Sequence, residues 1–287
     1  GFSASEYDQF RSALSVTLQA RLVPADALAI GWLETRTPDE MSRYPEVCGR
    51  AHGILRSALS RDVIQPGTTS TADVEWWLRQ EVSDRGYRSW FHPTVSVQRN
   101  EGPQAQAASF AASPEGKVLL PGDLVHIDFG IVYLGLHTDQ QQHGYVLGRT
   151  ESAPPRGLSH GLAACNRLQD IVTAEFATGR TGNEVLEAAR FRAAEEALVA
   201  TIYTHPIGFH GHAAGPTIGL WDKQDGVPGA GDYPIWPDTA YSIELNVALS
   251  IPEWSDQLVR IMLEEDALFD GDTVEFMDGR QKEFWLI

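Results

Sequence analysis

A small set of acidic and histidine side chains in this sequence has the types and the order of a metal site. The set is Asp128, Asp139, His205, Glu244 and one of the adjacent pair Glu264 and Glu265. All of them except Asp139 stand in or beside apolar, β-like runs, where an unpaired charge is costly to desolvate. Four carboxylates and one imidazole form a hard, oxygen-rich ligand set. Such a set suits two divalent ions of the Mn, Co, Fe or Zn kind.

Each of these residues also has an ordinary structural explanation when it is taken alone. Asp139 could end a strand, His205 could be a hydrogen-bonded core imidazole, and Glu244 could pair with an arginine. The acidic run 264–266 could be a solvated face. The metal hypothesis therefore depends on the whole set.

The two aspartates would be positioned by a pair of short strands. Residues 124–129 and 131–136 are rich in β-branched and aromatic residues, and Gly130 between them predicts a kink. Asp128 then lies inside the first strand, and Asp139 lies just beyond the second. A shared metal ion would pair both charges.

The other elements follow from apolar periodicity and from turn residues. Thr37, followed by Pro38 and two acids, indicates a helix start. Helical spacing of apolar residues predicts helices over residues 46–64, 71–85, 158–177 and 182–201. Strand-like composition marks residues 94–98, 240–251 and 257–269. Helix pairs precede strands in both halves of the chain, which predicts an α+β fold with two similar halves around one sheet.

The chain of 287 residues shows no linker between stable units. We therefore expect one catalytic domain over residues 46–287, preceded by an N-terminal helical extension or remnant over residues 1–45. Because Gly1 is not an initiator methionine, we expect that the chain was processed, was shortened or carries the remnant of a tag.

The composition disfavours several kinds of partner. With 22 basic and 39 acidic residues the formal net charge is -17, which opposes binding to nucleic acid or to an anionic membrane. No apolar run approaches the roughly 18 residues that span a bilayer. Cys48 and Cys165 make neither a disulfide framework nor a thiolate zinc motif. We expect a soluble protein, with the cytoplasm favoured and a secreted or periplasmic location open if a signal peptide was removed.

Five segments in this order resemble the metal signature of the pita-bread metallopeptidases, family M24, which include methionine aminopeptidase, aminopeptidase P and prolidase. The segments are GDLVHIDFG, YLGLHTD, HPIGFHGH, YSIEL and LEED. The resemblance covers roughly residues 31–287. It implies a pita-bread fold, in which two pseudo-symmetric halves surround a curved, antiparallel-rich sheet. The large N-terminal domain of aminopeptidase P and prolidase would be absent or reduced to the first 45 residues.

The resemblance also implies a role for each residue of the set. The implied metal ligands are Asp128, Asp139, His205, Glu244 and Glu264. His212 and Glu244 are the implied catalytic residues, because His212 would contact the scissile amide and Glu244 would move a proton. We prefer Glu264 over Glu265 because the family pattern is an apolar residue, the ligand glutamate and then an acid. A slip of one residue would turn that ligand to the opposite face.

Three departures from the family pattern concern substrate handling. Family members usually carry a histidine seventeen or eighteen residues before the first aspartate, whereas this window holds Phe110 and Ala111. The usual threonine-arginine-threonine after the second aspartate is replaced within residues 140–143. The proline that commonly follows the first glutamate is Leu245.

The implied function is a metal-dependent hydrolase that removes the N-terminal residue from peptides. Two divalent ions, manganese first and cobalt, zinc or iron as alternatives, would lower the pKa of a shared water and polarise the scissile carbonyl. The spacing of twenty between Glu244 and Glu264 is nearer to the proline-specific branch, so we expect an Xaa-Pro aminopeptidase or dipeptidase. The expected partners are a peptide or small amide substrate and a second copy of the chain in a homodimer.

Two other functions are compatible with parts of the sequence. A pita-bread protein could act on a non-peptide amide, or it could bind metal and ligand without peptidase activity.

The run from Gly157 to Gly161 matches the GxSxG pattern of serine hydrolases. That pattern must follow a strand, but here it opens a predicted helix, so we interpret Ser159 as a helix cap.

Overall fold

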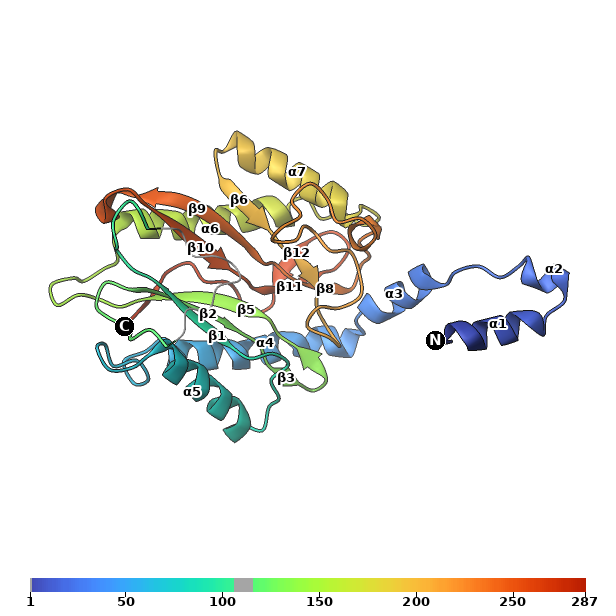
Figure 1. The fold of residues 1–287 in the computed structure, drawn as a ribbon, viewed down its shortest axis with the longest axis horizontal. Coiled ribbons are helices and arrows are strands. Elements are labelled where there is room, and N and C mark those ends of the chain that lie inside the picture. The colour runs from blue at the N-terminus through green and yellow to red at the C-terminus, as the bar shows by residue number, and fades with distance from the viewer. Residues whose placement is uncertain (1, 106–115) are drawn as a thin grey trace.

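The structure is a computed structural model that describes residues 2–105 and 116–287 (Figure 1). Its helices are α1 (Ala4–Ser12), α2 (Val16–Gln19), α3 (Asp26–Glu34), α4 (Pro38–Ala58), α5 (Thr71–Asp84), α6 (Arg156–Thr173) and α7 (Gly182–Glu195), with 3-10 turns η1 (Ala230–Asp232) and η2 (Pro252–Trp254). Its strands are β1 (Thr94–Gln98), β2 (Leu124–Phe129), β3 (Val132–Tyr133), β4 (Leu136–His137), β5 (Gln140–Tyr145), β6 (Val199–Ile202), β7 (His205–Pro206), β8 (Thr239–Ser242), β9 (Leu245–Ile251), β10 (Gln257–Leu263), β11 (Asp266–Phe269), β12 (Val274–Phe276) and β13 (Trp285–Leu286).

The first half of the fold is a sheet of order β1-β2-β5-β13 covered by α4 and α5. β1, β2 and β5 are antiparallel, and β13 joins β5 in parallel. The helices lie below this sheet in Figure 1. Their apolar faces and the sheet share one core, which includes Tyr44, Ile54, Leu78, Val95 and Ile127. This burial fixes β2, and with it Asp128.

The second half repeats the arrangement with other segments. The sheet of order β10-β9-β6 is covered by α6 and α7, which lie above it in Figure 1. A further sheet has the order β12-β11-β8-β7. Along the chain, β8 leads into β9 and β10 leads into β11, so both connections pass between this sheet and the previous one. Residues 243–244 separate β8 from β9, and residues 264–265 separate β10 from β11. Both predicted glutamates therefore lie where the chain passes from one sheet to the next.

A single backbone bridge connects the two halves at this point. The N–H of Gln141 in β5 donates to the carbonyl of Glu264 at 2.9 Å, and the N–H of Glu264 donates back to Gln141 at 3.3 Å. The halves therefore meet edge to edge at the level of the glutamates. The α+β arrangement of two similar, antiparallel-rich halves is confirmed, but the expectation of one sheet is wrong, because the described strands are divided among several sheets.

Several local predictions are confirmed and others are wrong. Thr37 does cap α4, with a reciprocal bond between Thr37 and Glu40. The helix predicted over 182–201 is wrong beyond Glu195, because residues 199–202 pair with β9 as β6. The strand predicted over 131–136 is instead the small β3-β4 hairpin, which turns at Leu134 and Gly135, both with positive φ. Ser159 is not a cap, because α6 already begins at Arg156.

The N-terminal segment extends away from the rest of the molecule (Figure 1). Neither α1 nor α2 contains a buried residue, and in α3 only Glu34 is buried. The boundary expected between residues 45 and 46 falls inside α4, so the division into 1–45 and 46–287 stays a prediction. Among the described helices none is long and apolar enough to cross a membrane.

Candidate metal centre

Asp139 is held in place because the chain, after the β3-β4 hairpin, passes close to Gly130 at the end of β2. The indole N–H of Trp90 donates to the carbonyl of Thr138 at 2.9 Å, and the N–H of Asp139 donates to the Asp266 carboxylate at 3.2 and 3.3 Å. A Cβ atom at position 130 would lie only 2.1 Å from the Thr138 carbonyl oxygen, so this return requires Gly130. The kink predicted at Gly130 thus brings the second aspartate back beside the first.

Glu244 and Glu264 approach each other from the two sheet junctions. The Gln141 side-chain amide donates to Glu244 Oε1 at 2.8 Å and to Glu264 Oε2 at 2.6 Å. Ser242 Oγ donates to Glu264 Oε1 at 2.7 Å. Both glutamates are at least 95% buried.

His205, from the short strand β7, faces the carboxylates. Its Nδ1 lies 3.1 Å from the Pro206 carbonyl oxygen, which can only accept, so Nδ1 carries the proton. Its Nε2 lies 3.3 Å from Glu264 Oε1, 3.7 Å from Asp139 Oδ2 and 3.8 Å from Glu244 Oε2. A neutral ring with Nδ1–H presents the Nε2 lone pair that binds a metal.

Three overlapping groups of ligand atoms result, each with all members within 4.8 Å of one another. The groups are Asp128, Asp139 and Glu264; His205, Glu244 and Glu264; and Asp139, His205 and His212. All five predicted metal ligands are therefore brought together. Glu264, Asp139 and His205 each belong to two of the three groups.

The electrostatics of this cluster favour the binding of a cation. Burial, together with the charge of Glu264, raises the pKa of Asp128, Asp139 and Glu244 well above the usual range. Three buried atoms of this cluster have no hydrogen-bond partner among the described residues: Asp128 Oδ1, Asp139 Oδ1 and His205 Nε2. Buried polar atoms are normally satisfied, and divalent cations would satisfy these three and offset the repulsion. The donor set therefore fits the metal pair that the sequence predicts.

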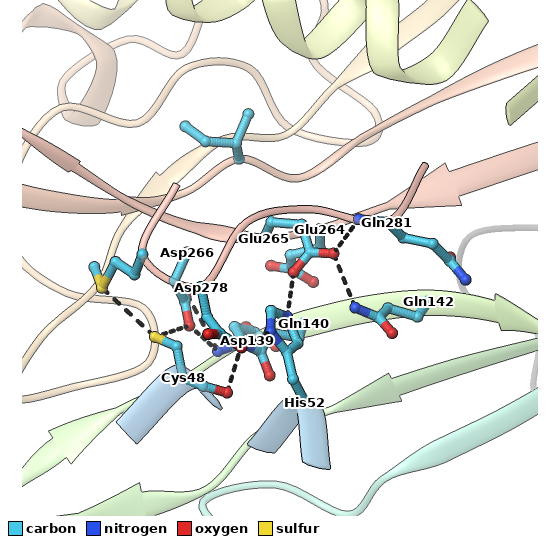
Figure 2. Close-up of polar contacts among 12 residues, drawn as sticks. Cys48, His52, Asp139, Gln140, Gln142, Glu264, Glu265, Asp266, Asp278 and Gln281 are labelled. Atoms are coloured by element: carbon cyan, nitrogen blue, oxygen red, sulfur yellow. Dashed lines mark hydrogen bonds and ion pairs between the residues drawn. The ribbon is translucent and has the colours of Figure 1, made fainter. Parts of the chain in front are cut away.

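Glu265 belongs to none of these ligand groups, and Figure 2 shows it bonded instead to His52, Gln142 and Gln281. Its carboxylate accepts from His52 Nε2 at 2.6 Å, and from Gln142 Nε2 and the N–H of Gln281, both at 3.0 Å. The geometry therefore places Glu264, and not Glu265, among the ligand atoms.

The sequence matches the metallopeptidase family M24 over residues 42–269. The chain belongs to family M24. By this membership it is a hydrolase of the metallopeptidase class, and its α+β architecture is the pita-bread fold. A search of curated proteins gave no match.

Solved structures similar to this M24 chain share its fold at low sequence identity. The X-Pro aminopeptidase of Thermotoga maritima has a TM-score of 0.67 and 16% identity, over 99% of this chain and 73% of the other. The dipeptidase PepE of Mycobacterium ulcerans has a TM-score of 0.67 and 19% identity, over 96% of this chain and 68% of the other. The methionine aminopeptidase of T. maritima has a TM-score of 0.58 and 20% identity, over 86% of this chain and 99% of the other. At these identities the likeness concerns the fold.

His212 lies at the edge of the M24 ligand cluster, where three aromatic or imidazole rings are close to its own ring and part of its surface is exposed to solvent. Its ring centroid is 4.4 Å from that of His205, 5.7 Å from Trp90 and 5.9 Å from Tyr203. Burial and the neighbouring His205 lower the pKa of His212 to about 4. A Cβ atom at position 211 would lie 2.2 Å from the Trp90 ring, so Gly211 allows the indole to approach. His212 therefore presents a neutral ring toward the ligand groups.

Two other histidines, His92 and His143, lie apart from the cluster of ligand atoms. His92 is on the outer surface, where it contacts Arg79 and Glu75. His143 is fully buried and bonds the backbone of Val125 and Met262, as expected for a structural histidine. The window of Phe110 and Ala111 lies outside the described residues.

The structure adds four residues that sequence reasoning did not place in the M24 site. They are His52, Trp90, His126 and Gln141. The one sequence signal was the departure at 140–143, where amides and a histidine replace the family residues. His52 lies far away in the chain, in α4, so its contact with Glu265 is visible only in the fold.

His52 gives this M24 chain a predicted pH dependence of stability. Both ring nitrogens face carboxylates, with Nδ1 2.8 Å from Asp278 and Nε2 2.6 Å from Glu265. Burial opposes the charge, but the two carboxylates outweigh it and raise the pKa of His52 to about 9. The stabilisation is then complete below the usual histidine pKa of about 6.5, falls as pH rises, and is lost above about 9.

We expect metal-free His52→Asn to be less stable than the parent near pH 6 by about 3 kcal/mol, the equivalent of this pKa shift. Near pH 10 the difference should nearly vanish. Urea unfolding across this range measures it, with exposed His160→Asn as the control. A difference that stays constant with pH would contradict a charged His52.

Proposed function

We propose that this chain is a dinuclear metallo-aminopeptidase that removes the N-terminal residue from peptides, with Xaa-Pro sequences as its preferred substrates. The proposal rests on three buried atoms from separate segments that converge here and have no hydrogen-bond partner in the described part of the chain. They are Asp128 Oδ1, Asp139 Oδ1 and His205 Nε2. Leaving such atoms unpaired typically costs about 1–3 kcal/mol each, and more when the group is charged. Ions at this position would remove that cost.

The proposed ligands are Asp128, Asp139, His205, Glu244 and Glu264. Divalent ions held by them would supply a Lewis acid for the scissile carbonyl and would lower the pKa of a water nucleophile. Oxygen and imidazole donors are compatible with manganese, and also with cobalt, zinc or iron. We propose manganese as the first ion to test.

The chain's own residues supply substrate orientation and proton transfer. His212 stands beside the ligand groups with a neutral ring, so one nitrogen can donate to the carbonyl oxygen as negative charge develops there. Glu244 keeps Oε2 free of protein hydrogen bonds within the described residues, and this oxygen can take and return a proton. Trp90 and Tyr203 pack against His212 and limit its movement.

The proposed substrate class is tested by digestion of a peptide library with mass-spectrometric readout, after loading with Mn²⁺, Co²⁺ or Zn²⁺ separately. We expect loss of single N-terminal residues, fastest where proline is the second residue. Cleavage confined to internal bonds would overturn the aminopeptidase proposal. Bound metal without any cleavage would favour action on a non-peptide amide or a binding function.

Replacing His212 with Asn should lower kcat roughly a hundredfold or more, the usual effect of losing one donor to a developing oxyanion. Metal content should not change, because the five proposed ligands remain. The measurements are initial rates on a cleaved peptide and metal analysis of the same sample. His92→Asn, on the outer surface, is the control. Unchanged kcat in His212→Asn would remove His212 from the proposed mechanism.

A further inference from the structure

A buried hydrogen-bond chain runs through the first sheet to the two glutamates. Ser96 in β1 pairs with His126 in β2, and Ser96 Oγ lies 3.4 Å from His126 Nδ1. His126 Nε2 lies 3.0 Å from Gln141 Oε1 in β5. The Gln141 amide then reaches Glu244 and Glu264. Each of these side chains is at most 9% exposed.

The carboxylates fix the direction of this chain. Carboxylates that hold a metal are ionised and only accept hydrogen bonds. As metal ligands, Glu244 and Glu264 therefore need the NH2 group of Gln141 to face them, and both of its N–H bonds are used. Gln141 Oε1 therefore faces His126, so His126 Nε2 must carry the proton. The imidazole thus selects one of the two orientations of the amide.

The oxygens that Gln141 holds are not the ones that face the histidine ligand. Gln141 bonds Glu244 Oε1 and Glu264 Oε2, whereas His205 Nε2 is close to Glu244 Oε2 and Glu264 Oε1. One amide therefore anchors both glutamates by their far oxygens and leaves the near oxygens toward the ligand groups. Without it, two buried like charges would be free to rotate apart.

We propose that Gln141 is a positioning residue that sets both glutamates for metal binding, and that His126 acts through Gln141 by fixing its amide. The inference rests on the proposed metal site. Groups that orient metal ligands typically contribute tenfold to a hundredfold in affinity. Gln141 stands in the stretch where this sequence departs from the family pattern, so the departure would be a different way to hold the same ligands.

The test measures Mn²⁺ affinity by isothermal titration calorimetry on the full chain. Gln141→Met keeps the shape of the side chain and removes both donors. We expect it to weaken Mn²⁺ binding roughly tenfold to a hundredfold. His126→Leu should weaken binding by less, and the double variant should bind no more weakly than Gln141→Met alone. The control is His143→Leu, whose ring lies 4.9 Å from that of His126 but bonds only backbone groups. It should lower the urea midpoint and leave Mn²⁺ affinity within about twofold of the parent.

The outcomes separate the inference from the proposed function. If the parent binds less than one equivalent of metal, the proposed function fails and the inference fails with it. If the parent binds metal and Gln141→Met binds equally well, only the inference is overturned. If the losses of Mn²⁺ affinity in the two single variants multiplied in the double variant, that result would contradict the proposal that His126 acts through Gln141. If Gln141→Met does not fold, Gln141→Asn provides the same test, because its shorter amide cannot reach both glutamates.

Discussion

Asp139→Asn is expected to abolish metal-dependent peptide hydrolysis while the fold survives. Asp139 belongs to two of the three ligand groups, and its Oδ1 has no hydrogen-bond partner among the described residues. Asparagine keeps the shape of the side chain but removes the charge that would hold the cations. We expect kcat/KM to fall by at least roughly a thousandfold, because the proposed ions would lose a ligand and the reaction would lose the electrostatic stabilisation that they supply.

The matched control for this substitution is Asp123→Asn. Asp123 is equally buried, but its carboxylate is paired with Arg99 at 2.6 and 2.7 Å and lies outside the ligand groups. We expect that variant to lose stability and keep its activity per folded molecule. Steady-state kinetics with circular dichroism on both variants separates the two effects. Undiminished turnover in Asp139→Asn would refute the proposed site.

The adjacent glutamates are expected to give opposite results. Glu264→Gln should lose metal affinity by at least tenfold, while the metal-free protein should unfold at the same or a higher urea concentration. The reason for the second effect is that the charge of Glu264 repels Asp128, Asp139 and Glu244 in the absence of metal. Glu265→Gln should instead keep metal binding and lose up to about 3 kcal/mol of stability, because it leaves the buried His52 without its closest counter-charge.

Calorimetric titration with Mn²⁺ and urea unfolding of the metal-free protein measure the two effects in the same pair of variants. Each variant is the control for the other, since both replace a fully buried glutamate by its amide. If Glu265→Gln lost metal and Glu264→Gln lost stability, the assignment of the two faces would be reversed.

The ligand set could be predicted from the sequence because its members break a local pattern. Asp128 and Glu244 interrupt apolar, strand-like runs, and such charges need a partner. The choice of Glu264 over Glu265 came from the family pattern of an apolar residue, the ligand glutamate and then an acid. It agrees with the geometry because β10 keeps its register up to the bridge with Gln141. The fold class followed from helix pairs that precede strands in both halves.

Strand β5 could not be predicted, because its stability comes from distant partners. Its sequence begins with three glutamines and a histidine, and it has no apolar alternation. Every residue is nevertheless buried. The side chain of Gln141 forms hydrogen bonds with His126 and two glutamates. That of Gln142 forms them with Glu265 and Trp285. Sequence periodicity detects burial against apolar neighbours, and it misses a strand that is buried against polar ones.

The central claim is that the converging carboxylates and His205 hold two divalent ions. The most direct measurement is a calorimetric titration of metal-free protein with Mn²⁺, with elemental analysis of the saturated sample. We predict two equivalents per chain for the parent and less than one tightly bound equivalent for Asp139→Asn. Less than one equivalent in the parent, after reconstitution with Mn²⁺ or Co²⁺, would contradict the dinuclear site.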